Sequence, residues 1–512
     1  MIRAYLARAS APLAALAVLA VGAAAWPFTI DDAFITAHYA ARLASGHGLT
    51  VVDGPPTDGV TGPLWLLPGV LAALVGLSPI AAQKALGLAL IALASALVVR
   101  RAAQRQGGQI AAPITALLVV AGPTLGVWGA AGLESGAATL ALTAAVLGAT
   151  ARPRPNALLV GVCVGLLAWL RPEACAAGMV ALAATGARGG RRAGAWAAGV
   201  AAAFGVAVVA YRLALFGHVL PLAVQAKPGE LAAGVDYVLR GALVSTGGAG
   251  LVLAGLAGLR AQGAQRWTLA LVGVFLGSVA IAGGDWMPGF RLLAPILPTV
   301  ALLAGAGSRA TLLASRRPLT RALLGAALLV ALGVPLLDLV AQLPEVRAAG
   351  ATRERAGRPL ARWLGARAHR VALVDVGFLP YVGGFDAIDL GGVTEPEVAR
   401  LAGGHLDKLI DPAWLAERAP DALVLHASVA PRISPTGDLL TLAGYPVERR
   451  LAELPWVRAT FRVERIVEYA PGYVYVVLLR RRTTGAGGRS AAGCPPPGCA
   501  RGARAAAPRR PG

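Results

Sequence analysis

Long apolar runs separated by short polar stretches fill the first 341 residues of the chain. Eleven of these runs reach or approach the roughly 17–25 residues that a transmembrane helix needs. They predict membrane-spanning helices at residues 9–28, 80–99, 110–128, 135–151, 156–171, 173–187, 193–215, 239–259, 267–282, 291–307 and 321–341. We therefore expect a polytopic α-helical membrane protein with about eleven transmembrane helices. Because further spans follow the first run, we interpret it as a retained anchor helix and not as a cleaved signal peptide.

Arginine-rich clusters between the runs set the expected orientation in the membrane. They lie at residues 100–106, 152–154, 188–192, 260–266 and 315–321. With a cytoplasmic N-terminus all of them face the cytoplasm, as the positive-inside rule requires. One further apolar run, residues 62–79, is short and interrupted by Pro68, and a full span there would put the later clusters outside. We therefore expect a re-entrant or interfacial helix at this position.

The pattern changes after residue 341. A charged amphipathic helix is expected first, at 345–369, and three later runs bounded by Gly, Pro or charge are typical of strands: 370–382, 421–429 and 473–481. The chain then divides into three expected parts, which are a transmembrane module at 1–341, an α/β domain on the outer face at 342–481, and a disordered basic tail at 482–512.

Composition supports the membrane assignment and narrows the function. Hydrophobic residues make up 56% of the 512 residues and charged residues only 14%, against about 25% charged in soluble domains. The net charge of +21 comes mainly from arginines between the apolar runs and in the tail, so we do not expect nucleic acid as a partner.

Cys494 and Cys499 in the tail either form a small disulfide loop or stay as thiols. The chain has no P-loop, dinucleotide fingerprint or serine nucleophile elbow, which argues against a cytoplasmic nucleotide-dependent site.

The loops on the side opposite the arginine clusters hold nearly all the acids and histidines of the membrane region. These outer loops are residues 29–79, which include juxtamembrane helices, and residues 128–136, 170–174, 216–230 and 283–291. Ionisable groups at the ends of a membrane bundle are energetically costly and usually functional. Five loops that bring such groups to one face predict a single active site.

The adjacent acids Asp31 and Asp32 are the strongest candidates for catalysis. A carboxylate at the membrane boundary can accept a proton from a hydroxyl or bind a divalent cation. Alternatively, an Asp at this position caps the helix that follows. We expect one of the two to cap that helix and the other to be free. No cofactor is required by the sequence beyond this possible cation.

Cations of the outer loops are candidate contacts for an anionic lipid phosphate, which guanidinium and ammonium groups bind through charged hydrogen bonds. Arg171 has an alternative role, a salt bridge with Glu173 at a helix junction. A cation at a helix start, such as Arg291, opposes the helix dipole, so it needs either Asp285 or a ligand phosphate beside it. The candidate phosphate-binding residues are Arg171, Lys227 and Arg291.

Other polar residues of these loops are candidate substrate contacts. His47 is either a ligand contact or a packing residue of its loop. Glu134 either contacts substrate or stabilises a helix N-terminus through the dipole. The full set of candidate contacts is His47, Asp58, Glu134, Glu173, His218, Asp285 and Trp286.

Several motifs, taken in order, resemble the GT-C membrane glycosyltransferases. The resemblance is greatest to bacterial proteins similar to the terminal arabinofuranosyltransferase of mycobacterial cell-wall synthesis. The motifs are "DDAFITAHYAARLASGHGL", "GLES", "LRPE", "FGHVLPLAVQAK", "GGDWMPGFRLLAPILP" and "VDVGFLPYVGGFDAIDLGGVTEPE", within about residues 25–400. The chain departs from the family at "DGVTGPLW", where Asp58 replaces a more usual Glu.

The resemblance implies a function and a location. The donor would be a sugar on a polyprenyl phosphate and the acceptor an envelope glycan or lipid, with inversion at the sugar. Asp31 or Asp32 would be the general base, with Asp31 favoured, and Arg171, Lys227 and Arg291 would stabilise the leaving phosphate. The protein would be a multi-pass protein of the bacterial cytoplasmic membrane, with its active site and C-terminal domain on the extracytoplasmic side. The alternatives are a transporter or flippase of lipid-linked sugars and a protein O-glycosyltransferase.

Overall fold

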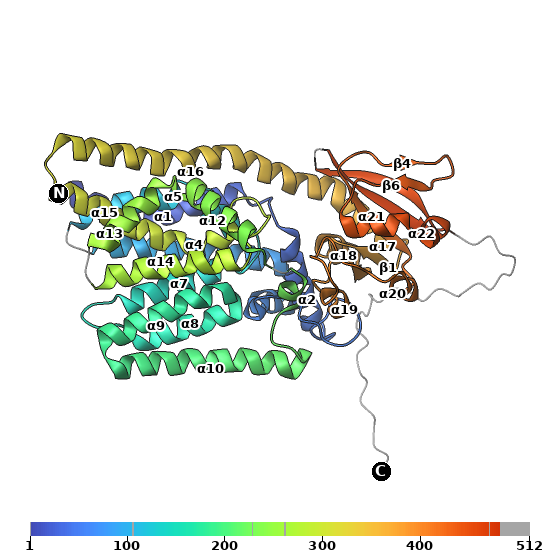
Figure 1. Ribbon diagram of the computed structural model, residues 1–512, viewed down its shortest axis with the longest axis horizontal. Helices are drawn as coiled ribbons and strands as arrows, with labels where there is room; N and C mark the ends of the chain where they lie inside the picture. Colours follow the sequence, from blue (N-terminus) through green and yellow to red (C-terminus); the bar gives the residue numbers. More distant parts are fainter. Residues whose placement is uncertain (1, 105–106, 228, 261–262, 471, 482–512) are drawn as a thin grey trace, which may run out of the picture. The chain divides into compact units, whose positions relative to one another are not determined.

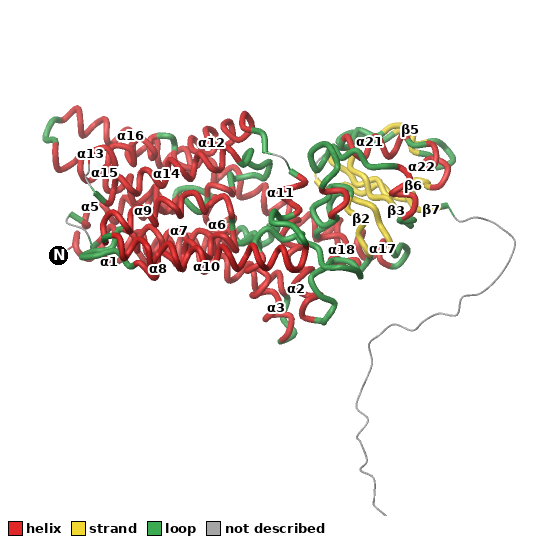
Figure 2. The backbone as a smooth tube through the Cα atoms, turned by 60° about the horizontal axis from the view of Figure 1, so that its bottom comes forward, coloured by secondary structure: helices red, strands yellow, loops and turns green. Residues whose placement is uncertain are grey.

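The computed structural model describes residues 2–104, 107–227, 229–260, 263–470 and 472–481. The expected basic tail and its two cysteines lie outside these ranges. Residues 1–480 form one compact unit, in which a bundle of helices is followed by a domain of mixed helices and strands (Figures 1 and 2).

The described part of residues 2–352 contains helices joined by loops, with short 3-10 turns η1 (Pro63–Trp65), η2 (Pro172–Ala174) and η3 (Arg291–Leu293). The helices are α1 (Ile2–Ala24), α2 (Asp31–Ala44), α3 (Leu66–Leu74), α4 (Pro79–Ala103), α5 (Gly108–Val120), α6 (Thr124–Gly129), α7 (Ser135–Ala149), α8 (Ala157–Leu170), α9 (Cys175–Gly189), α10 (Arg191–Phe216), α11 (Leu222–Ala226), α12 (Leu231–Thr246), α13 (Ala249–Arg260), α14 (Ala264–Ile281), α15 (Leu297–Ala314) and α16 (Pro318–Thr352).

All eleven apolar runs are helical, but they are not eleven equal spans. Within the described residues, six helices are long and apolar enough to cross a membrane, or seven if the pair α12 and α13, bent by 92°, counts as one. The run at 110–128 is divided into α5 and α6 where Gly122 and Pro123 interrupt the helix. The chain is thus a multi-pass membrane protein with six to seven candidate spans, and α7, α8 and α9 are shorter helices of 14 or 15 residues.

The span expected at 239–259 is broken into two helices, because two glycines end α12. Gly247 and Gly248 have φ values of +61° and +65°, a left-handed conformation that terminates helices. A Cβ on Gly247 would lie 2.2 Å from the carbonyl oxygen of Val330 in α16, so no other residue fits there without movement.

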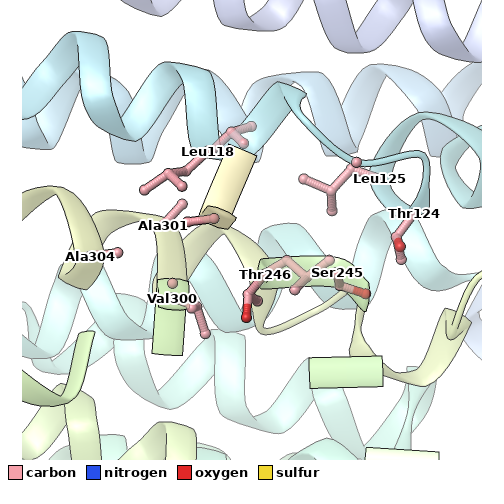
Figure 3. A pocket seen from close by; sticks show the side chains of 13 residues that line it. Leu118, Thr124, Leu125, Ser245, Thr246, Val300, Ala301 and Ala304 are labelled. Carbon is pink, nitrogen blue, oxygen red and sulfur yellow. The ribbon is translucent and has the colours of Figure 1, made fainter. Parts of the chain in front are cut away.

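Beside this bend lies a cavity of only about 20 Å³ (Figure 3), where Ser245 and Thr246 face apolar side chains of α5 and α15. It has room for about one water molecule and no ionisable lining.

Small residues bring the helices of the bundle close together. Helix α8 packs on α7 and α10, α1 on α4 and α5, and α13 on α15. Where α4 meets the start of α7, a Cβ on Gly136 would lie 2.1 Å from the carbonyl oxygen of Gly87. Such contacts are typical of membrane helices, which gain stability from close packing. The run at 62–79 forms η1 and α3, which pack against α2 and α4; its interfacial or re-entrant position stays a prediction.

The long helix α16 leads directly into the C-terminal α/β domain (Figure 1). The connection is one π-helical turn, η4 (Arg353–Gly357). The other helices of the domain are α17 (Arg358–Gly365), α18 (Phe378–Gly383), α19 (Pro396–Ala399), α20 (Pro412–Glu417), α21 (Pro446–Glu453) and α22 (Pro455–Thr460). Its strands are β1 (Arg370–Leu373), β2 (Asp386–Asp389), β3 (Ala422–Ala427), β4 (Arg432–Ile433), β5 (Leu439–Thr441), β6 (Phe461–Ala470) and β7 (Tyr473–Arg480).

Five of these strands form one sheet in the order β2-β1-β3-β7-β6. The strands β2, β1 and β3 are parallel, and β7 is antiparallel to β3 and β6. Side chains of β3 alternate between two hydrophobic clusters, since Val424 packs toward α17 and α18 while Leu425 packs toward α20 and α21. Both faces of the sheet are therefore covered. The expected strand at 370–382 ends at Leu373, because the second half of that run forms α18.

The domain shares a hydrophobic cluster with the first outer loop. Phe34 of α2 meets Phe378 of α18 with ring centroids 5.0 Å apart, in an edge-to-face arrangement. Tyr39 belongs to the same cluster and is fully buried. This packing fixes the start of α2, which carries the two candidate acids, against the domain.

Candidate functional site

A cavity of about 550 Å³ lies between α2, the end of α16 and the C-terminal domain. Its ionisable lining residues come from distant parts of the chain: Asp31, Asp32, Lys227, Arg353, Asp375, His405 and His426. Its aromatic lining residues are Phe28, Trp286, Phe378, Tyr445, Tyr469, Tyr473 and Tyr475. A concave site with a few converging polar groups and an apolar remainder is typical of small-molecule and lipid-headgroup binding.

A second cavity of about 640 Å³ adjoins the first. The two cavities share Lys227, Trp286, Pro288 and His405. Its other polar residues come from α12 and from the loop after α14, and include Asp236, Arg240 and Asp285. Lys227 and Trp286 therefore lie where the two cavities meet.

Asp31 joins the helical bundle to the domain. Its carboxylate oxygens accept hydrogen bonds from the backbone N–H groups of Gly377, at 2.9 Å, and Phe378, at 2.8 Å, where α18 begins. Burial, followed by the nearby charge of Asp375, raises the pKa of Asp31 to about 7, although Arg353 and the hydrogen bond from Phe378 oppose the shift. A carboxylate with a pKa near neutrality is well matched to general base catalysis.

The expected capping role is wrong for both acids. The N-cap of α2 is Ile30, which has no side-chain hydrogen bond, and Asp31 and Asp32 occupy the first turn of the helix. In that position they favour the helix through its dipole. Asp31 instead bonds the first N–H groups of a different helix, α18, across 346 residues of chain.

Asp32 faces Arg291 and is less buried than its neighbour. Its Oδ2 lies 3.9 Å from Nη1 of Arg291, and its side chain is 31% exposed. Arg291 also binds Asp285 through Nε. Of the two alternatives for the anion beside Arg291, Asp285 or a ligand phosphate, the structure therefore shows Asp285. The Arg291 guanidinium lies 5.8 Å from the centre of the Trp128 ring, which adds a cation–π contact.

Arg171 is the centre of a buried ion cluster outside both cavities. Its Nε lies 2.9 Å from Oε1 of Glu134, and its Nη1 donates to Oε1 of Glu173 at 2.8 Å. Arg171 thus forms the salt bridge with Glu173 that was its alternative role. Two carboxylates neutralise this guanidinium, so the three predicted site residues of the cluster bind one another.

Asp58 is similarly occupied. It is buried and accepts a hydrogen bond at 3.0 Å from Nε of Arg212 on α10, whose Nη2 donates to the carbonyl oxygen of Thr61. His47 is exposed and contacts Ser45, and His218 bonds the Leu220 carbonyl and Gln225. None of these predicted contacts lines either cavity.

Sequence reasoning missed the residues that the C-terminal domain brings to the cavity. His426 lies between two carboxylates: its Nε2 is 3.1 Å from Oδ2 of Asp375, and its Nδ1 is 2.7 Å from Oε1 of Glu448. Tyr475 also donates to Asp375 Oδ2, at 2.7 Å. The available signals were an acid directly after a buried strand, for Asp375, and a single polar residue inside an apolar strand, for His426.

The imidazole of His426 keeps its positive charge between these two carboxylates. Burial opposes the charge on His426, but Asp375 and Glu448 outweigh it and raise the pKa of the imidazole to about 10. Burial likewise opposes ionisation of Asp375, but His426 and Tyr475 lower its pKa to about 2. The rings of Tyr445 and Tyr475 lie 4.9 and 5.1 Å from the His426 ring, so the charged pair also holds an aromatic wall of the cavity.

The described residues around Asp31 and Asp32 do not fit a divalent cation. Among them, no group of three or more His, Cys, Asp or Glu side chains is arranged to hold a metal ion. Both oxygens of Asp31 already accept backbone N–H groups, and Asp32 faces the guanidinium of Arg291.

Comparison with known proteins adds a fold and a domain family. Residues 345–484 match a family described as a domain of unknown function, DUF8728. No curated protein matches the chain. The structure of ArnT from Cupriavidus metallidurans bound to undecaprenyl phosphate has a TM-score of 0.55 and 14% sequence identity, and covers 93% of this chain and 99% of ArnT. The apo structure of the same ArnT has a TM-score of 0.53 and 16% sequence identity, and covers 90% of this chain and 97% of ArnT. The chain therefore has an ArnT-like fold over most of its length.

Proposed function

We propose that this protein is a membrane glycosyltransferase that moves a sugar from a polyprenyl phosphate to a hydroxyl group of an envelope glycan or lipid. The observation that carries the proposal is the cavity of about 550 Å³ at the end of the helical bundle, which Asp31, Asp32 and Lys227 line together. The ArnT-like fold supports a polyprenyl-phosphate-sugar-dependent enzyme. The motif resemblance implies arabinofuranose as the sugar.

In the proposed reaction Asp31 is the general base. The acceptor oxygen attacks the anomeric carbon, the bond from that carbon to the phosphate oxygen breaks, and the hydroxyl proton passes to Asp31. The sugar is inverted, and the carrier leaves as polyprenyl phosphate. The pKa of about 7 supports Asp31 for this role. Its two backbone hydrogen bonds hold the carboxylate in one orientation, while Asp32 keeps Arg291 beside the site.

The phosphate gains negative charge as the bond to the sugar breaks, and a fixed cation stabilises that charge. Lys227 suits this role because it lines both cavities and forms no ion pair or hydrogen bond with the residues that the structure describes. Of the other predicted phosphate contacts, Arg171 and Arg291 are bound by carboxylates. We assign those two arginines to holding the loops around the site.

We also propose that the cavity faces the extracytoplasmic side. The arginine clusters meet at the other ends of the helices, where Arg101 donates to the Thr150 carbonyl and Arg188 to the Ala149 carbonyl. Positive residues gather at the cytoplasmic face of membrane proteins. The site and the domain then lie where an envelope acceptor is available, in a bacterial cytoplasmic membrane.

The proposal is tested by sugar transfer from a polyprenyl-phosphate sugar with the purified protein in lipid vesicles. Loss of the general base in Asp31→Asn is expected to lower the rate by roughly 10²- to 10⁴-fold. The wild-type rate is expected to rise with pH through about 7, because only the ionised carboxylate accepts a proton. Asp53→Asn is the matched control, since Asp53 is an 85% exposed acid of the same outer loop.

Two outcomes would contradict the proposal. Full transfer activity in both Asp31→Asn and Asp32→Asn would remove these acids from the reaction. Movement of the lipid-linked sugar across the vesicle membrane, without a new glycosidic bond, would favour a transporter.

A further inference from the structure

Arg353 reaches the cavity from an unusual piece of backbone. It is the first residue of η4, the π-helical turn that connects α16 to α17. Such turns are rare and occur frequently at functional sites. The Arg353 side chain lines the 550 Å³ cavity together with Asp31 and Lys227, although nothing in the local sequence distinguishes it from the neighbouring arginines.

Two aromatic rings hold the Arg353 guanidinium in place. Its central carbon lies 5.9 Å from the ring centre of Phe34 on α2 and 5.7 Å from that of Phe378 on α18. Guanidinium groups stack on aromatic rings while their N–H groups remain available around the edge. The rings therefore orient the cation without using its hydrogen-bond donors.

Within the residues that the structure describes, Arg353 has no anionic partner in contact, unlike three buried or partly buried arginines near the same end of the bundle. Arg171 and Arg212 are bound by carboxylates at 2.8–3.0 Å, and Arg291 by Asp285. In the described part of the chain, Arg353 forms neither an ion pair nor a hydrogen bond, and the same holds for Lys227. Both of these cations line the same cavity.

The acids nearest to Arg353 are already occupied by other donors. Both oxygens of Asp31 accept backbone N–H groups of Gly377 and Phe378. Oδ2 of Asp375 accepts from Tyr475 and faces His426. These acids offset the charge of Arg353 without forming a direct pair. A guanidinium that lies over aromatic rings, has unused donors and lines the same cavity as an ammonium group offers the charged donors with which proteins bind phosphate oxygens.

We propose that Arg353 and Lys227 together hold the phosphate group of the lipid carrier. This inference rests on the proposed function and refines it, because it moves the phosphate site from the predicted Arg171 and Arg291 to the boundary between the bundle and the C-terminal domain. The domain then contributes to donor binding through α18, whose Phe378 orients Arg353.

The test is equilibrium binding of undecaprenyl phosphate to the full-length protein in detergent micelles, followed by tryptophan fluorescence. Loss of charged hydrogen bonds in Arg353→Gln is expected to weaken binding by roughly 10- to 100-fold. Arg355→Gln is the matched control, because Arg355 belongs to the same turn, is exposed and does not line the cavity. Thermal unfolding of both variants checks that the turn is intact, and Arg353→Lys should recover part of the affinity.

The outcomes separate this inference from the function on which it rests. Wild-type affinity in a folded Arg353→Gln variant would overturn the role of Arg353 and leave the glycosyltransferase proposal standing. Failure of the wild-type protein to bind undecaprenyl phosphate would contradict the proposed function itself. Inorganic phosphate is the second probe: if it displaces the lipid at equal concentration, the site is one for free phosphate, and the assignment to a lipid carrier is wrong.

Discussion

Two buried clusters in this protein have the same arrangement, a cation between two carboxylates. In the helical bundle Arg171 lies between Glu134, at 2.9 Å, and Glu173, at 2.8 Å. In the C-terminal domain His426 lies between Asp375, at 3.1 Å, and Glu448, at 2.7 Å. The first cluster lies outside both large cavities, whereas Asp375 and His426 line the one that contains Asp31.

The chemical difference between the clusters lies in the cation. A guanidinium stays charged at any pH that a protein survives, so the Arg171 cluster is a permanent brace between the start of α7 and the turn after α8. An imidazole can lose its proton, and His426 keeps it only because Asp375 and Glu448 raise its pKa to about 10. Similar geometry therefore gives a contact of fixed charge at Arg171 and a titratable residue, His426, in the lining of the cavity.

Removing the cation from each cluster is expected to have the largest effect. Arg171→Met or His426→Leu leaves two carboxylates, at least one of them buried, without their shared cation, which costs about 3–5 kcal/mol. The thermal midpoint of the protein in detergent should fall by roughly 3–5 °C in each variant. A second substitution, Glu134→Gln or Glu448→Gln respectively, should restore part of the loss. A fall of less than about 2 °C in either single variant would break the comparison, because that cluster would not need its cation.

A pH titration of stability is expected to separate the clusters. The folded-state pKa of His426, about 10, is above its ordinary value of 6.5. The charged imidazole therefore contributes stability that is complete below about pH 6.5 and is lost as the pH rises through about 10. Wild-type protein should lose stability between pH 7 and 10 relative to His426→Gln, whereas Arg171→Met should follow the wild-type slope.

The measurement is the thermal midpoint of the three proteins over that pH range, since taking the difference between variants cancels the titration of other groups. An identical slope for wild type and His426→Gln would show that His426 is neutral in the folded protein.

The local pattern predicted the helices well because apolar runs are a property of neighbouring residues. The predictions fail where a few residues interrupt a run, as at Gly122–Pro123 and Gly247–Gly248. The run at 370–382 fails for a different reason. Its second half becomes α18, whose first N–H groups are bound by Asp31 from the other end of the chain.

The candidate site could be predicted only in part, for the same reason. The structure brings Asp31, Asp32, Lys227 and Trp286 to one cavity. These residues stood out in the sequence because charged and aromatic residues are conspicuous between apolar runs. Arg353 and His426 did not stand out, since arginines and strand residues are ordinary in a domain of mixed composition. Their importance depends on contacts across the chain, which spacing does not reveal.

Removing one carboxylate from each cluster is the smallest change, and it gives the sharpest comparison. In Glu173→Gln, Arg171 keeps its contact with Glu134 at 2.9 Å, so we expect a loss of only about 1–2 kcal/mol that does not depend on pH. In Glu448→Gln, His426 keeps only Asp375 as a charged partner, so its pKa should fall below about 10. The alkaline loss of stability should then begin at a lower pH than in the wild type. Thermal midpoints of both variants between pH 7 and 10 measure this, and an unshifted curve for Glu448→Gln would mean that Asp375 alone keeps the imidazole charged.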